Sequence, residues 1–440
     1  MKNYEQIKTV LLIGLVCLSL VLTWQLWSFQ SNVTLLDETA QYIPSEVMSE
    51  EKKLSDVIIP QQMIVVKDGE RRIVLPNQVK FQSLYDTLLN VRISDWNASR
   101  LSEQTESENG VVFLFSTAIP LDLFFSLFQS EPPNESFSER EVSQLYLYVT
   151  TDENVHLQFI DENDASIVDV VTSLSKTDLE QTFFASFQDF EKAIKIEVES
   201  RRDIYIPAES VTVDRLAFSV STISGQFFKQ ALFPDPASVR FYRQSDNEVA
   251  YTDGSRIMNI RSNGLFMEYN SPVFSSEQRE RSSKHIVQRS YEFINSHGGW
   301  TDDYYLVNWE AKDFRDIAEY RLHINRYPVI SFERFDQMIL RVSRSGNQTE
   351  GYTRPLFYLD SQLHGAKEEV ALPSGEEIVE RIEALDYLDS SRIEHVTIGY
   401  EMMMPSQSFI SAEPHWFVLY DGRWQKISVE EEGGKEDGLE

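Results

Sequence analysis

Cysteine is almost absent from this chain. Of its 440 residues only Cys17 is a cysteine, so no disulfide can form within one molecule. Eukaryotic secreted domains commonly depend on disulfides, whereas an exterior without cysteine is ordinary for a bacterial surface protein. The sequence therefore favours a bacterial protein whose domains are held together by packing.

Positive charge is also scarce. Forty Lys and Arg residues face seventy Asp and Glu residues, which gives a formal net charge of −30. Such acidity disfavours binding to nucleic acid, to anionic lipid and to anionic wall polymers. A solvated acidic surface explains the charge, and a dedicated cationic partner is the alternative.

Catalytic and cofactor motifs are lacking as well. The seven histidines are scattered singly, no pair has the spacing of a zinc-binding helix, and no glycine-rich phosphate loop or G-x-S-x-G motif occurs. We therefore predict that the protein is not an enzyme and holds no cofactor or metal. An anchored enzyme whose catalytic residues come from distant positions stays an alternative.

The most prominent feature present is an apolar run over residues 9–29, which contains no charged side chain. At a helical rise of about 1.5 Å per residue, this run is long enough to cross the roughly 30 Å hydrocarbon layer of a membrane. Lys2 and Lys8 precede it and the next Lys is Lys52, so residues 1–8 are expected to be cytoplasmic and the bulk of the chain extracellular. A cleaved signal peptide, or a lipoprotein modified at Cys17, is the alternative, although the run ends in Trp-Gln-Leu-Trp without a small-residue cleavage site.

One face of the expected transmembrane helix has small or polar residues. At 100° per residue, a narrow stripe contains Gly14, Cys17, Leu18, Val21, Gln25 and Ser28. Small residues allow close helix approach, and Gln25 gains from a hydrogen-bonding partner in lipid. We expect this face to bind a partner helix, unless Gln25 simply lies at the membrane interface.

The rest of the chain is predicted to be a tether followed by three α+β domains. Residues 30–60 form the polar tether. We place an N-terminal α+β domain at residues 61–206, a central repeat domain at 207–334, a C-terminal repeat domain at 335–429 and an acidic tail at 430–440. In the first domain, Asp68-Gly69 indicates a hairpin, residues 78–93 an amphipathic helix, and Ser138 with Glu141 the capping box of a short helix.

The last two domains are expected to be repeats of an antiparallel sheet with a covering helix. Each contains a hairpin, then a helix that starts at Ser282 or Ser374, then one strand and a closing hairpin. The turns of two of these hairpins are marked by Asn263-Gly264 and Asp421-Gly422.

Two patches in the repeats have residues typical of binding sites. In residues 297–304, Asp302 and Asp303 are possible cation ligands and Trp300 a possible partner-binding anchor. The structural interpretation, which we favour, is a glycine helix cap with Trp300 folded onto the core. Residues 413–420 are rich in aromatic side chains, which alternating packing in a sheet also explains.

Several stretches together resemble the YycH (WalH) family. They are the end of the apolar run, WQLWSF, and the later segments LFMEYNSP, INSHGGWTDDY, TRPLFYLD, LPSGEEIVERI and EPHWFVLYDGRW. The resemblance covers essentially the whole chain, and the order of the segments is more specific than any one of them.

The resemblance implies a regulator without catalytic residues. Members of the family modulate the WalK (YycG) sensor kinase of Gram-positive bacteria, and so cell-wall homeostasis, in a membrane complex with the related protein YycI. It implies that the transmembrane helix meets the kinase and that the ectodomain meets a YycI-like protein. A membrane-anchored wall-binding or adhesion protein is the rival interpretation.

Overall fold

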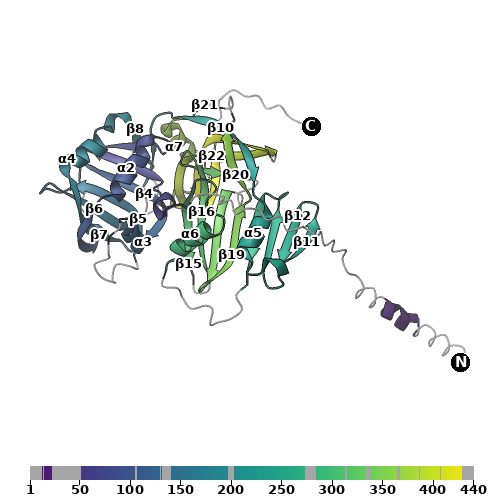
Figure 1. Ribbon diagram of the computed structural model, residues 1–440. Coiled ribbons are helices and arrows are strands. Elements are labelled where there is room, and N and C mark those ends of the chain that lie inside the picture. The colour runs from purple at the N-terminus through teal and green to yellow at the C-terminus, as the bar shows by residue number, and fades with distance from the viewer. Residues whose placement is uncertain are drawn as a thin grey trace, which may run out of the picture.

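Strands dominate the fold and form two large sheets that lie side by side (Figure 1). The computed structural model describes residues 12, 14–21, 51–104, 107–128, 130, 140–196, 203–272, 284–312, 315–332, 338–363, 367–385, 387–406 and 408–428. Helices lie against the sheets, so the mixed α+β class is confirmed.

The first sheet is antiparallel and belongs to the N-terminal part of the chain. It contains, in spatial order, β3 (Ile93–Arg100), β7 (Ser166–Ser175), β6 (Asn154–Asp161), β5 (Glu141–Val149), β4 (Gly110–Pro120), β1 (Gln62–Lys67), β2 (Glu70–Val74), β8 (Glu191–Ile196) and β9 (Ile204–Pro207). The predicted hairpin turn at Asp68-Gly69 joins β1 to β2, and both residues have positive φ. Positive φ at both central residues is the geometry of the two-residue turns that match strand twist.

Three helices belong to this sheet: α2 (Val79–Leu89), α3 (Leu121–Leu127) and α4 (Lys176–Leu179). Helix α2 covers most of the predicted amphipathic helix, and its residues Phe81, Leu84, Tyr85 and Leu88 are buried. The prediction is wrong at its end, because the helix stops at Leu89 and Ile93 begins β3. The short helix expected from Ser138 and Glu141 is wrong at Glu141, which begins β5, while Ser138 lies outside the described residues. The structure shows why: β5 pairs with β4 on one side and with β6 on the other, and most of its residues are buried on both faces of the sheet.

The second sheet collects strands from both expected repeat domains. Its order is β11 (Arg240–Ser245), β12 (Glu248–Thr252), β13 (Ile257–Arg261), β14 (Phe266–Asn270), β19 (Gln348–Pro355), β18 (Ile339–Ser345), β16 (Asp316–Ile324), β17 (Tyr327–Ile330), β22 (Ile393–Ser406), β23 (Phe409–Tyr420), β10 (Thr212–Thr222) and β20 (Phe357–Gln362). Three strands branch from it: β15 (Tyr304–Ala311) on β16, β21 (Glu368–Ala371) on β10 and β24 (Arg423–Ile427) on β23.

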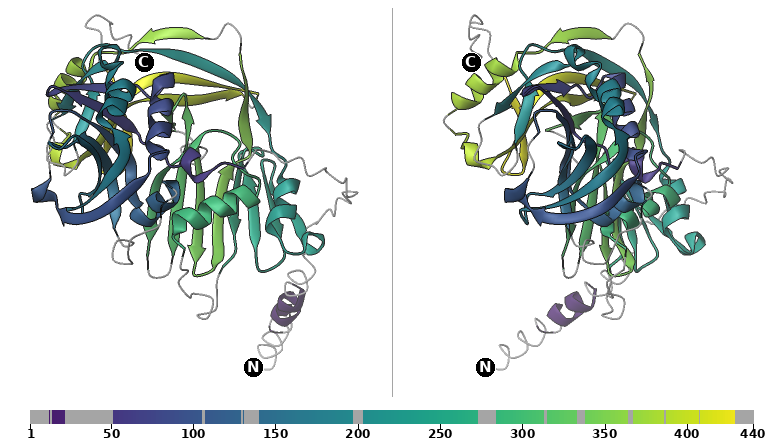
Figure 2. Two further views of the ribbon diagram at one scale, coloured as in Figure 1. Left: turned by 60° about the vertical axis from the view of Figure 1, so that its left-hand side comes forward. Right: turned by 90° about the vertical axis from the view of Figure 1, so that its left-hand side faces the viewer.

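The order of elements repeats along the chain as the sequence indicates. Hairpin β13–β14 is followed by α6 (Ile286–Ser296) and β15, and hairpin β18–β19 is followed, after β20 and β21, by α7 (Gly375–Glu383) and β22. Figure 2 shows α6 lying across one face of the sheet. The N-cap of α6 is His285, and Ser282 lies outside the described residues. The N-cap of α7 is Ser374, as predicted.

Strand pairing runs across residue 335, where we place a domain boundary. Strand β14 pairs with β19, and β16 pairs with β18, so the hairpin β18–β19 lies between strands of the preceding unit. In the other direction, β17 pairs in parallel with β22. The division at 335 stays a prediction, and hydrogen bonds join the two units in one sheet.

The N-terminal sheet contacts the second sheet along β15 and at the turn after β16, among other places. The N–H of Leu306 donates to the carbonyl oxygen of Val57 at 2.8 Å. Trp309 Nε1 donates to the carbonyl oxygen of Ala118 at 2.6 Å. Together with an Arg326 contact to the carbonyl oxygen of Pro76, these bonds fix the position of one sheet on the other.

The expected transmembrane helix falls largely outside the described residues. Within residues 9–29 the structure describes Leu12 and residues 14–21, which are helical and exposed. Among the described residues, no helix combines the length and the apolar character that a membrane crossing requires.

Replacing Gly375 by Ala should destabilise the fold, although Ala is the better helix former. A Cβ at this position, in the first turn of α7, would overlap the carbonyl oxygen of Pro207 at the end of β9. Because backbone must move to make room, we expect a loss of about 1–3 kcal/mol in the free energy of unfolding, measured by urea denaturation. The control is Glu380→Ala on the exposed face of α7, and an equal effect of the two changes would contradict this packing.

Candidate functional site

The loop after α6 turns sharply because two glycines adopt positive φ. Gly298 has φ +99°, and a Cβ there would lie 2.9 Å from the ring of Phe228, so both the conformation and the space call for glycine. Gly299 follows with φ +67°, and its N–H donates to the carbonyl oxygen of Ile294 at 2.8 Å. The chain thereby reverses over the end of the helix, as the predicted glycine cap requires.

Trp300 points into the protein from this loop. Only 2% of its surface is exposed, and its ring packs edge-on against Tyr320 with centroids 4.9 Å apart. Its Nε1 donates to Oδ1 of Asn295 at 2.7 Å. These contacts agree with the structural interpretation of Trp300, whose indole is not available on the surface of this structure.

Arg354 of β19 supports the loop from below. Its guanidinium is fully buried and donates to the carbonyl oxygen of Gly299 at 3.1 Å and to the hydroxyl of Tyr352 at 3.0 Å. It also lies 4.9 Å from the centroid of the Phe228 ring. The planar guanidinium can make both hydrogen bonds and a stacking contact at once, which an ammonium cannot do equally well.

The same loop and the C-terminal half of α6 hold Lys52, which lies just before the first domain. The hydroxyl of Tyr291 and Nδ2 of Asn295 donate to the carbonyl oxygen of Lys52 at 2.6 and 3.1 Å, and the N–H of Lys52 donates to Oδ1 of Asn295 at 3.3 Å. Its Nζ donates to the carbonyl oxygen of Asp302 at 2.8 Å and to the carboxylate of Asp303 at 2.9 Å. We call Tyr291, Asn295, Asp302 and Asp303 the Lys52 clamp.

Most of the binding energy of the clamp must come from its hydrogen bonds to the Lys52 backbone. The Asp303 side chain is 61% exposed, and ion pairs of such exposure contribute little. Tyr291 and Asn295 hold the N–H and the carbonyl oxygen of Lys52 in position. Leaving these backbone groups without hydrogen-bond partners would lower the stability of the fold. Residues some 240 positions apart are therefore joined at one point.

Both predicted cation ligands have protein partners. The Asp303 carboxylate binds Nζ of Lys52, and Oδ1 of Asp302 accepts the N–H of Leu359 at 3.0 Å. Among the described residues no group of three or more His, Cys, Asp or Glu side chains is placed to hold a metal ion. Asp302 and Asp303 thus bind other parts of the same chain.

Burial sets the protonation of Asp302. It raises the pKa of this carboxyl to about 6, against the opposing effects of the Leu359 N–H and of Arg354. Asp302 therefore changes charge in a mildly acidic range, next to the carbonyl group that binds Lys52.

The predicted partner-binding face in the first helix is described in part. Gly14, Cys17, Leu18 and Val21 lie on an exposed helical segment, and Cys17 is a free thiol. Gln25 and Ser28 lie outside the described residues.

The second aromatic patch is packed inside the sheet. Trp416, Phe417 and Val418 of β23 are each at most 2% exposed, and Nε1 of Trp416 donates to the carbonyl oxygen of Pro373 at 2.9 Å. Sheet packing thus accounts for these aromatic side chains, which is one of the two interpretations that the sequence allows.

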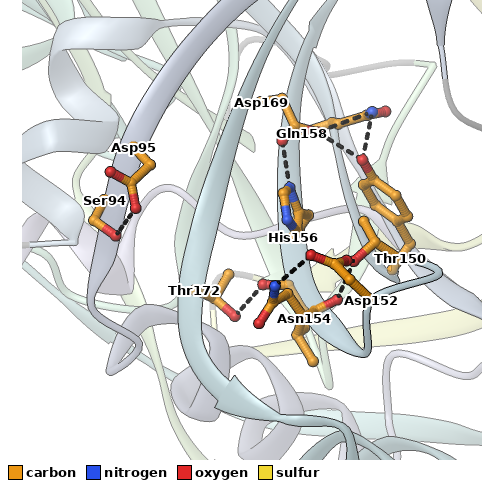
Figure 3. Close-up of polar contacts among 11 residues, drawn as sticks. Ser94, Asp95, Thr150, Asp152, Asn154, His156, Gln158, Asp169 and Thr172 are labelled. Atoms are coloured by element: carbon orange, nitrogen blue, oxygen red, sulfur yellow. Dashed lines mark hydrogen bonds and ion pairs between the residues drawn. The ribbon is translucent and has the colours of Figure 1, made fainter.

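A polar cluster in the N-terminal sheet was not predicted (Figure 3). Asp169 of β7 accepts from the ring of His156 at 2.6 Å, from the hydroxyl of Tyr148 at 2.8 Å and from Nε2 of Gln158 at 3.1 Å. A His–Asp pair occurs in catalytic triads, but no described hydroxyl or thiol is hydrogen-bonded to Nε2 of His156. Alternating polar residues on adjacent strands were the signal, but strand register is not evident from one sequence.

Two family models cover almost the entire chain. The YycH protein C-terminal domain matches residues 201–434, and the YycH protein N-terminal domain matches residues 5–189. The chain belongs to the YycH family. The resemblance inferred from the sequence segments is therefore confirmed.

Two relatives agree with this assignment. The Bacillus subtilis (strain 168) protein named "Two-component system WalR/WalK regulatory protein YycH" is 23% identical, and the match covers 95% of each chain. The crystal structure of YycH from Bacillus subtilis is similar in fold, with a TM-score of 0.70 at 19% identity, over 86% of this chain and 98% of that one. The family is thus known for regulation, and neither match names a catalytic activity.

Asp302→Asn should stabilise the protein more at pH 7 than at pH 4. Between the usual pKa of 3.8 and about 6 the native state holds a proton that the unfolded chain has released, so stability falls as the pH rises through this window. The asparagine variant lacks this loss, and we expect its advantage in free energy of unfolding to grow by on the order of 2 kcal/mol.

Urea denaturation at the two pH values measures that difference. Asp95→Asn, at an exposed position, measures the general effect of removing one negative charge from an acidic protein. A stability difference between Asp302→Asn and the unaltered protein that does not change with pH would contradict the shifted pKa.

Proposed function

We propose that this protein is a membrane-anchored extracytoplasmic regulator of a WalK-like (YycG-like) sensor kinase. The observation that carries the proposal is its membership of the YycH family, with a relative that is named for regulation of the WalR/WalK system and matches 95% of this chain. Through this kinase the protein would influence cell-wall homeostasis. The site consists of attachment contacts, which suits a protein that acts by holding and positioning others.

The proposed anchor is the apolar run at residues 9–29, with the N-terminus in the cytoplasm. The matched N-terminal family domain begins at residue 5 and so includes this run. In its described part, Leu15, Leu18 and Val21 are each more than half exposed. Apolar side chains exposed to this extent are suited to contact with lipid and with a partner helix.

Regulation requires that the protein bind two signalling states of the kinase with different free energies. Tight but equal binding would shift nothing, because an equilibrium moves only by the difference in affinity. We propose that the stripe from Gly14 to Ser28 packs on a kinase helix and that the ectodomain sets its rotation or height. The Lys52 clamp supports this idea, because it fixes the end of the tether to the second sheet.

The proposed ectodomain partner is a YycI-like protein. The support is the family resemblance, in which the two related ectodomains assemble at the membrane. The rival function, binding to the wall, is disfavoured by the net charge of −30, which repels anionic polymers.

The test is co-purification of the sensor kinase after crosslinking in intact membranes. We expect the unaltered protein to recover a WalK-like kinase, and the double change Gly14→Leu with Gln25→Leu to recover several-fold less, because bulk replaces a close contact and a polar partner is lost. Ser19→Leu is the matched control, since it enlarges a small residue on the opposite side of the helix.

Two results would contradict the proposal in different ways. If the unaltered protein recovers no kinase, the regulatory function is wrong. If the kinase is recovered equally with the double variant, the function stands but the stripe is not the contact surface.

A further inference from the structure

A cavity of about 450 Å³ lies where the two sheets meet. Its walls come from three parts of the chain: the segment before β1 and strand β4, strands β15 and β16, and the ends of β22 to β24. Residues that line it include Gln61, Ser116, Arg321, His323, Leu419 and Trp424. The volume lies within the range of small-molecule sites, which often form between domains.

Arg321 contributes a buried positive charge to this cavity. The neighbours of Arg321 on β16, Tyr320 and Leu322, belong to the opposite face, where the Tyr320 hydroxyl contacts Ser290 of α6 at 2.7 Å. Arg321 therefore lies on the face away from α6, and only 9% of its surface is exposed.

The guanidinium of Arg321 is poorly satisfied within the described residues. Its Nη1 donates to the carbonyl oxygen of Val329 at 3.2 Å, and no described carboxylate lies within 4 Å. The nearby Glu319 is engaged with Arg341 at 2.8 Å and with Asn308 at 3.2 Å. Glu319 offsets part of the positive charge electrostatically, but a guanidinium has five donors, and among the described residues only Nη1 has a hydrogen-bond partner.

The other polar groups of the cavity limit the charge of a ligand. The ring of His323 is buried against Tyr305, and burial lowers its pKa to about 3, so it is neutral. Glu319 and Glu394 also line the cavity, and Glu394 accepts the N–H of Gly422 at 2.6 Å. A ligand with two negative charges, such as phosphate, would meet one cation and two carboxylates.

We propose that this cavity binds a small, singly charged carboxylic acid whose carboxylate is held by Arg321. A guanidinium matches a carboxylate with two parallel hydrogen bonds. Leu419, Pro328 and Trp424 provide apolar surface for the remainder of the ligand. Residues of both sheets line the cavity. A bound ligand would therefore contact both sheets and would stabilise their relative position. This inference is independent of the kinase.

The test is thermal unfolding of the full-length purified protein with N-acetyl-leucine and with its neutral amide, at equal ionic strength. We expect the acid to raise the melting temperature by about 2 °C or more at saturation, because a ligand that binds only the native state stabilises it. The amide and inorganic phosphate should have little effect. No difference between acid and amide, or a larger effect of phosphate, would overturn the proposal.

The variant Arg321→Met tests whether Arg321 is the group that holds the carboxylate. This change replaces a buried guanidinium, which has no ion pair within 4 Å among the described residues, by an apolar chain of similar length, so we expect the protein to fold with a melting temperature no lower than before. The response to the acid should then fall to that of the amide, and Arg321→Lys should keep part of it.

The control is Arg261→Met, which removes the same charge from the exposed hairpin pair with Glu268 and should leave the response intact. An acid-specific shift that survives in Arg321→Met would overturn the assignment of Arg321.

Discussion

The side-chain amide of Asn295 is the contact on which the arrangement around the tether depends. Its oxygen accepts from Nε1 of Trp300 and from the N–H of Lys52, and its nitrogen donates to the carbonyl oxygen of Lys52. An amide suits this position because it is donor and acceptor at once. One side chain in the last turn of α6 thereby fixes both the loop after the helix and the segment before the first domain.

The loop that Asn295 holds also joins the two repeat units. Arg354 donates to Gly299, and Leu359 donates to Asp302, so β19 and β20 support the loop that contacts Lys52. Two of the sequence segments that carry the family resemblance, INSHGGWTDDY and TRPLFYLD, therefore meet in space. Close-packed interiors transmit displacement, so a shift between the strands of this sheet would reach Lys52 and the tether. The proposed membrane helix and this clamp form the two ends of the proposed coupling.

Local features could be predicted from the sequence, and long-range partners could not. The turns at Asp68-Gly69 and Asp421-Gly422, helix α2 and the Ser374 cap depend on residues close in sequence. The insertion of hairpin β18–β19 between β14 and β16 depends on pairing between distant strands, which hydrophobic periodicity does not encode. The glycine cap next to Trp300 is a local signal, so Trp300 could be assigned to the core. Lys52, the partner of Asp303, is distant in sequence and could not be foreseen. Arg321 gave no signal, because a lone arginine in a strand usually faces solvent.

The most direct test of the account is the effect of the double change Lys52→Met with Tyr291→Phe on kinase regulation in reconstituted membranes. The measurement is autophosphorylation of the WalK-like kinase with the full-length protein, compared with Lys53→Met with Tyr387→Phe, which makes the same two changes at exposed positions. We predict that the first double change alters the regulatory effect at unchanged kinase binding, because the ammonium contacts and the Tyr291 hydrogen bond to the Lys52 carbonyl oxygen are lost, and that the control does not. Equal regulation by the first double variant and the unaltered protein would contradict the claim that the clamp couples the ectodomain to the proposed membrane helix.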